Sequence, residues 1–171
     1  MRSLLDRLNN PLHLLIALAS TWLVASSPWI GMYQALPDQP GALNLSHVVI
    51  GLAVLPLAIV YFAACAVGGR WRLYFPWAGG QFGGIGRDLA GILKGQRPGS
   101  EGGGLFAAVE GVLLLALLAT AVTGALWFMG RDSEAAIVWR GHHILAARAL
   151  TGLLLMHVLA VSLHFVDLVR D

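Results

Sequence analysis

Four stretches of this 171-residue chain are apolar for long enough to cross a lipid bilayer. Crossing a hydrocarbon layer of about 30 Å takes roughly 20 residues of helix. The composition, with 57% hydrophobic and 12% charged residues, excludes an ordinary soluble domain. A spanning segment must satisfy its backbone hydrogen bonds internally, so each stretch predicts a helix. We expect an all-α fold, an integral membrane four-helix bundle in a single domain, with helices at about 11–33, 46–67, 105–129 and 136–165.

The basic residues predict how this bundle is oriented. Arginine and lysine gather near both ends of the chain and in the connection 68–104, whereas Arg131 and Arg140 alone flank the opposite side. Cytoplasmic loops carry the excess of basic residues, so both termini and this inner loop are expected in the cytoplasm. The first apolar run also resembles a secretory signal, because it ends in the small residues "VASS", but it is longer than the usual apolar region of such a signal. The net charge of +2 is a topology signal and gives no indication of nucleic-acid binding.

The inner loop is rich in glycine and cannot form a fifth span. Apolar residues recur at helical spacing in its segment 81–94, which predicts an amphipathic helix along the inner headgroups. The motif "GGIGRD" follows no predicted strand and does not complete a dinucleotide fingerprint, so no nucleotide site is predicted there. The single cysteine, Cys65, excludes an internal disulfide and a covalent haem motif, and it is expected as a small packed side chain.

The last apolar stretch carries four histidines, His142, His143, His157 and His164. Ionisable groups inside a bilayer are costly and therefore suggest function, although a single histidine more often forms a hydrogen bond between helices. A step of 14 residues from His143 to His157 is about 21 Å along a helix and returns close to the same face. The two imidazoles therefore point the same way at two depths, which predicts two stacked sites.

Two further histidines have suitable depths for pairing. His47 lies near the outer end of the second helix and is level with His143, whereas His13 lies near the inner end of the first helix and is level with His157 or His164. Small or slim residues occur at the helical steps that follow these histidines. They either leave room for a flat macrocycle or serve helix packing. These residues are Ala17, Ser20, Thr21, Gly51, Val54, Ala58, Ala146, Ala147 and Leu150. Paired imidazoles on facing helices favour two bis-histidine haems. Zinc would need three or four ligands at one depth, and no Cys, Asp or Glu joins either pair.

The order of these histidines resembles the prokaryotic cytochrome b561 family, which is similar to the cytochrome b subunits of nickel-iron hydrogenases and formate dehydrogenases. The resemblance rests on "NNPLHLL", "NLSHVVIG" and "HILAARALTGLLLMH", and on "GRDLAGILKGQRPG" and "TGALWF" around the third helix. It implies that His47 with His143 binds an outer haem b and that His13 with His157 binds an inner one. His142 is then a neighbour of a ligand, a distinction that helical geometry alone makes poorly.

The resemblance also implies electron transfer across the membrane between a quinone pool and a redox partner, expected in the periplasm, such as a hydrogenase, a dehydrogenase or a cytochrome c. The chain would then serve a quinone-linked oxidoreductase. At His164, a quinone or propionate contact competes with an interfacial histidine that has no special role. At Arg148, a propionate contact competes with snorkelling, and at Glu110 a proton relay competes with a bond to another helix. The other functional hypotheses are a non-redox anchor or assembly subunit, and a small transporter that uses Glu110 and Arg148.

Overall fold

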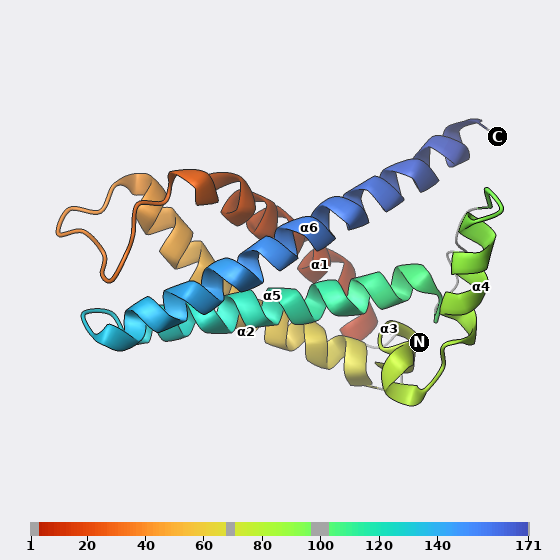
Figure 1. Ribbon diagram of the computed structural model, residues 1–171, viewed down its shortest axis with the longest axis horizontal. Coiled ribbons are helices and arrows are strands. Elements are labelled where there is room, and N and C mark those ends of the chain that lie inside the picture. The colour runs from red at the N-terminus through yellow and green to blue at the C-terminus, as the bar shows by residue number, and fades with distance from the viewer. Residues whose placement is uncertain (1–3, 68–70, 97–102, 171) are drawn as a thin grey trace. The chain divides into compact units, whose positions relative to one another are not determined.

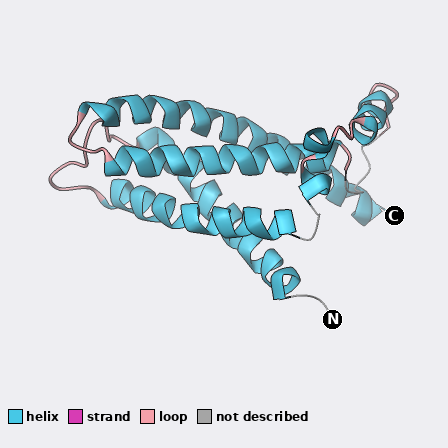
Figure 2. Cartoon of the chain, turned by 90° about the horizontal axis from the view of Figure 1, so that it is seen from below, coloured by secondary structure: helices cyan, strands magenta, loops and turns pink. Residues whose placement is uncertain are grey.

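The computed structural model describes residues 4–67, 71–96 and 103–170, and the side chains of residues 11–67, 71–96 and 103–162. The described chain is helical without a strand (Figure 2). Four helices are long and apolar enough to cross a membrane (Figure 1): α1 (Leu4–Ser26), α2 (Ala42–Ala66), α5 (Leu105–Met129) and α6 (Glu134–Arg170). The prediction of an all-α membrane bundle of four helices is confirmed.

The first helix differs from its predicted bounds at both ends. It begins at Leu4, ahead of Pro11, and it ends at Ser26 rather than continuing to Tyr33. A 3-10 turn, η1 (Ser27–Trp29), follows. Pro28 explains this end, because a proline disfavours the α conformation of the residue before it and has no N–H to continue the helix.

The other spans lie close to their predicted positions. α2 begins at Ala42, slightly earlier than expected, and α6 extends at both ends of its predicted range. The amphipathic segment of the inner loop is helical, as predicted, in α4 (Gly83–Ile92). Two short elements were not predicted, α3 (Trp71–Tyr74) and η3 (Pro76–Gly79).

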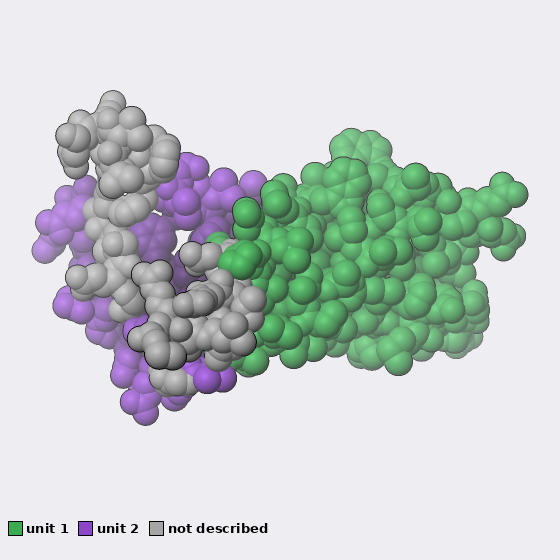
Figure 3. Space-filling model, turned by 180° about the vertical axis from the view of Figure 1, so that it is seen from behind, with its two compact units in different colours: residues 1–64, 116–149 green, residues 65–115, 150–171 purple. Residues whose placement is uncertain are grey.

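The chain forms two compact units, which Figure 3 colours separately. Unit 1 comprises residues 1–64 and 116–149, and it therefore contains α1, most of α2, the second half of α5 and the first half of α6. Unit 2 comprises residues 65–115 and 150–171.

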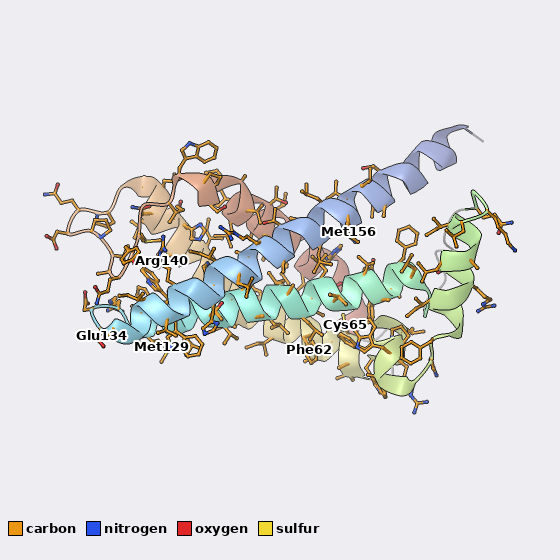
Figure 4. All side chains as sticks on the ribbon, in the orientation of Figure 1. Phe62, Cys65, Met129, Glu134, Arg140 and Met156 are labelled. Carbon is orange, nitrogen blue, oxygen red and sulfur yellow. The ribbon has the colours of Figure 1, made fainter. Side chains whose placement is uncertain are left out.

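Unit 1 is closed at one end by an outer cap, which we define as residues 30–36 together with the turn 130–133. The Trp127 indole N–H donates to the Tyr33 carbonyl at 3.0 Å, and the Arg140 guanidinium (labelled in Figure 4) donates to the Met32 carbonyl at 3.1 Å. The buried side chains of Met32, Trp127 and Ala136 form an apolar cluster beneath these bonds. The cap therefore joins the segment after α1 to the hairpin between α5 and α6.

The turn of the outer cap has a residue with a left-handed backbone. Asp132 has a φ of 70°, a conformation that aspartate tolerates better than most residues. The Gln34 side-chain amide donates to the Ser133 carbonyl at 3.1 Å, across the cap. This turn is thus held by side chains from the loop that follows α1.

Unit 2 packs the inner loop closely against the start of α5. Asp88 of α4 accepts the backbone N–H of Leu105 at 2.7 Å, which satisfies one of the free donors at the beginning of α5. Further along α5, Gly111 lies so close to the Tyr74 carbonyl and the Trp77 ring that a Cβ atom there would collide with the backbone. A glycine at this position therefore allows the segment of α3 and η3 to lie against α5.

Candidate functional site

Two of the predicted histidines lie side by side inside unit 1. His47 of α2 and His143 of α6 are both half-buried, and their ring centroids are 6.5 Å apart with an angle of 88° between the ring planes. They come from helices that are distant in sequence, so the bundle itself brings the rings together. The structure thus joins the pair that the sequence predicted at the outer depth.

One nitrogen of the His143 ring is held by α5. Its Nδ1 lies 2.9 Å from the carbonyl oxygen of Thr120, which can only accept a hydrogen bond. Nδ1 therefore carries the proton, and Nε2 keeps a lone pair. This tautomer leaves Nε2 free to bind a metal, and histidine ligands usually have such a partner on their other nitrogen.

The His47 ring has a weaker bond of the same kind. The buried Ser26 hydroxyl lies 3.4 Å from His47 Nδ1 and donates its own proton to the Leu23 carbonyl at 3.2 Å. A lone pair of the Ser26 oxygen is then available to accept the Nδ1 proton of His47. Both rings of the pair therefore present Nε2 as the free acceptor.

The separation of the two rings suits ligands of one metal ion. If both Nε2 atoms bound the same ion from opposite sides, bonds of about 2 Å and roughly 1 Å from nitrogen to ring centre would place the ring centroids about 6 Å apart. The observed 6.5 Å agrees with that separation. One turn beyond His47, a Cβ atom at Gly51 would meet nothing within 4 Å, so the α2 surface is open there. Val54 and Ala58, in contrast, are buried against protein and serve helix packing.

His142, the neighbour of His143, has a different environment. Its side chain is exposed, and its ring lies against Trp139 with the centroids 5.7 Å apart. His47 therefore meets His143 and not His142. Helical geometry alone did not separate these two residues.

The inner pair is less defined. His13 of α1 is exposed and stacks on Tyr61 of α2, with ring centroids 5.8 Å apart and an angle of 15° between the planes. His157 is half-buried on α6. Because His13 belongs to unit 1 and His157 to unit 2, their pairing remains a prediction.

The remaining predicted residues have diverse surroundings. The exposed Arg148 has no hydrogen bond or ion pair with any described side chain, and Glu110 is half-buried near the start of α5. The side chain of His164 lies outside the described residues. Cys65 is buried, as predicted.

Three residues of the site were not predicted from the sequence: Ser26, Thr120 and Gly124. A Cβ atom at Gly124 would lie 3.0 Å from Cε1 and 3.1 Å from Nδ1 of His143, so this glycine makes room for the ring. Gly124 belongs to the motif "TGALWF", which contributed to the family resemblance without an assigned role. That motif was the available signal, whereas a backbone carbonyl such as that of Thr120 leaves no trace in a sequence.

Among the described residues, no group of three or more His, Cys, Asp or Glu side chains is placed to hold a metal ion.

Comparison with known proteins shows that the family model described as prokaryotic cytochrome b561 matches residues 6–168. No curated protein and no solved structure matches the chain. Four spanning helices and a match over nearly the whole length lead to one conclusion. The chain belongs to the prokaryotic cytochrome b561 family and is a multi-pass membrane protein of the kind that binds haem b and transfers electrons across the membrane.

Proposed function

We propose that the chain carries electrons through two bis-histidine haems b, between a quinone pool and a redox partner on the periplasmic side of the bacterial inner membrane. The observation that supports this most directly is the His47–His143 pair, with a centroid separation that suits one iron and with both Nδ1 atoms already engaged. Haem iron, when bound, supplies reversible one-electron chemistry. The protein then contributes ligands, spacing and a tuned environment.

The outer ligands in this proposal are His47 and His143, each through Nε2. Thr120 holds the His143 ring and Ser26 lies within reach of the His47 ring, each at Nδ1, which leaves Nε2 of both rings for coordination. A proton held at Nδ1 also makes the imidazole a stronger donor at Nε2. These contacts at Nδ1 support a site for a metal that takes two neutral nitrogens.

The inner ligands are His13 and His157. His157 follows His143 by about 21 Å along α6. Haem edges are nearer to each other than their irons are, so this spacing along one helix suits electron transfer between two cofactors. Tyr61 stacks on His13, and we assign it the role of holding that ring.

We also propose roles for polar residues that are not haem ligands. Arg148 has no partner among the described side chains, and a haem propionate would supply the anion that its charge lacks. We place a quinone or propionate contact at His164, because a histidine at the cytoplasmic boundary exchanges protons near neutral pH.

The redox partner in this proposal is a hydrogenase, a dehydrogenase or a soluble cytochrome c. It docks on the outer side, where the short loops 37–44 and 130–135 would form a low platform over the outer haem. The chain then works as the membrane subunit of a quinone-linked oxidoreductase, in the manner of the cytochrome b subunits of nickel-iron hydrogenase and formate dehydrogenase.

A reduced-minus-oxidised visible spectrum of the purified protein tests the proposal. We expect a sharp α band of b type, and a folded protein without colour would instead support a non-redox anchor or a transporter.

The ligand assignment is tested by His143→Ala, with His142→Ala as its matched control. We expect the first variant to lose one haem and the second to keep both, since only one of two adjacent helical residues faces the cofactor squarely. The opposite result would move the ligand to His142.

A further inference from the structure

The His143 ring lies close to the backbone of α5 at one residue, Gly124. A Cβ atom at Gly124 would be 3.0 Å from Cε1, 3.1 Å from Nδ1 and 3.9 Å from Nε2 of His143. The two shortest distances are tighter than ordinary van der Waals contact, so any larger residue would push the imidazole aside. The ring therefore occupies space that exists only because residue 124 is glycine.

The same glycine gives His143 access to its hydrogen-bond acceptor. Side chains of a helix tilt toward its N-terminus, so residue 124 is the one whose side chain would lie over the carbonyl of Thr120, one turn earlier. With no side chain there, His143 Nδ1 reaches that oxygen at 2.9 Å. The ring thus contacts α5 in two ways. Its Nδ1 atom donates a hydrogen bond to the Thr120 carbonyl, and its Cε1 and Nδ1 atoms pack against Gly124.

These two contacts restrain different motions of the imidazole. The hydrogen bond fixes the tautomer and the position of Nδ1, whereas the contact at Gly124 limits rotation of the ring about the line from Nδ1 to Thr120. The resulting plane is nearly perpendicular to that of His47, at 88°. The angle between axial ligand planes affects the electronic structure of a haem, because each imidazole interacts with the iron d orbital that is perpendicular to its plane.

We propose that Gly124 is a positioning residue that sets the plane of the His143 ligand and, through it, the spectrum and potential of the outer haem. The inference rests on the proposed ligand role of His143. If His47 and His143 hold a haem with their planes perpendicular, two iron d orbitals would interact equally with them and stay nearly degenerate, which would give a strongly anisotropic EPR signal in the ferric state. A ring displaced from this orientation gives a less anisotropic signal and a longer bond to Thr120.

The test compares Gly124→Ala with Gly141→Ala in the full-length, haem-loaded protein. Gly141 lies in the same helix as His143, and a Cβ atom there would meet nothing within 4 Å. Both substitutions remove the backbone freedom of a helical glycine, but only the first one touches the ligand. We expect Gly124→Ala to retain both haems, to shift the low-field EPR feature of the outer haem toward smaller anisotropy and to raise its midpoint potential. We expect Gly141→Ala to match the wild type in all three measurements.

The results for Gly124→Ala and for the wild-type protein distinguish the inference about Gly124 from the proposed function. Wild-type spectra and potentials in Gly124→Ala, with both haems present, would overturn the inference and leave the proposed function intact. Selective loss of the outer haem in this variant would support the inference in a stronger form. A wild-type protein that lacks an outer haem would overturn the proposed function and this inference with it.

A second variant keeps the test decisive if Gly124→Ala yields no folded protein or loses both haems. In His143→Gly, added imidazole can replace the missing ligand, and a free imidazole can avoid the new methyl group. We expect the double variant His143→Gly/Gly124→Ala to recover the outer haem at the imidazole concentration that rescues the single variant. Rescue of the single variant alone would show that Gly124 acts on the fold rather than on His143, and would overturn the inference.

Discussion

The Ser26 hydroxyl is expected to tune the outer haem through His47. Removing it in Ser26→Ala leaves the Nδ1 proton of His47 without its acceptor. A ligand whose N–H donates to an acceptor is a stronger electron donor and stabilises ferric iron. Loss of the bond should therefore raise the midpoint potential of the outer haem.

The length of the bond sets the size of this effect. At 3.4 Å, the Nδ1–Oγ distance exceeds the 2.7–3.2 Å that is typical of such bonds, so its contribution belongs at the lower end of the usual net range, about 0.5 kcal/mol. For a one-electron couple, a tenfold change in equilibrium corresponds to about 59 mV. We therefore expect an upward shift of about 20 mV.

Potentiometric titration of the purified protein measures this shift, and the neighbouring serine supplies the control. The Ser27 hydroxyl is exposed and donates to the Val24 carbonyl of its own helix at 2.9 Å. Ser27→Ala removes the same atom from the next residue without touching His47. A downward shift in Ser26→Ala, an equal shift in Ser27→Ala, or a shift confined to the inner haem would refute the reasoning.

Two further predictions concern the second ligand of the outer haem and the quinone end of the electron path. The Thr123 hydroxyl lies 2.7 Å from the Ala119 carbonyl and 3.0 Å from the Thr120 carbonyl, where it competes with His143 for the same acceptor. Thr123→Val should strengthen the bond from His143 and lower the outer midpoint potential by about 20 mV on the same scale, whereas an upward shift in the titration would contradict it. His164→Leu should slow quinone-linked turnover and leave both haem spectra unchanged; unchanged turnover would remove His164 from the quinone site, and loss of the inner haem would make it a ligand.

The helices were predictable because apolar length alone requires them in a bilayer, but their ends depend on local chemistry. Residues 105–129 were predicted correctly at both ends, since polar or glycine-rich connections flank that run. The first helix was predicted to reach about Tyr33. Met32 and Tyr33 instead belong to the outer cap, where their carbonyls accept hydrogen bonds from Arg140 and Trp127 that no local pattern encodes.

The sequence was enough to predict which two histidines form the outer pair of the site. Depth along the helices paired His47 with His143, and the structure brings these rings together. The groups that hold them were not foreseen, because Thr120 acts through its backbone and Gly124 acts through the absence of a side chain. Ser26 was passed over as one of several small residues at the end of an apolar run. Such roles depend on which helix faces which, and only the packed bundle specifies that.

The number of haems per chain tests the central claim most directly. Two bis-histidine pairs, His47 with His143 and His13 with His157, require two non-covalent haems b in each chain. Pyridine haemochrome absorbance, measured against protein mass by quantitative amino-acid analysis, should therefore give a ratio close to two, falling to one in His143→Ala. A ratio close to one in the wild-type protein would contradict the account, since one of the two pairs could then not be a haem site.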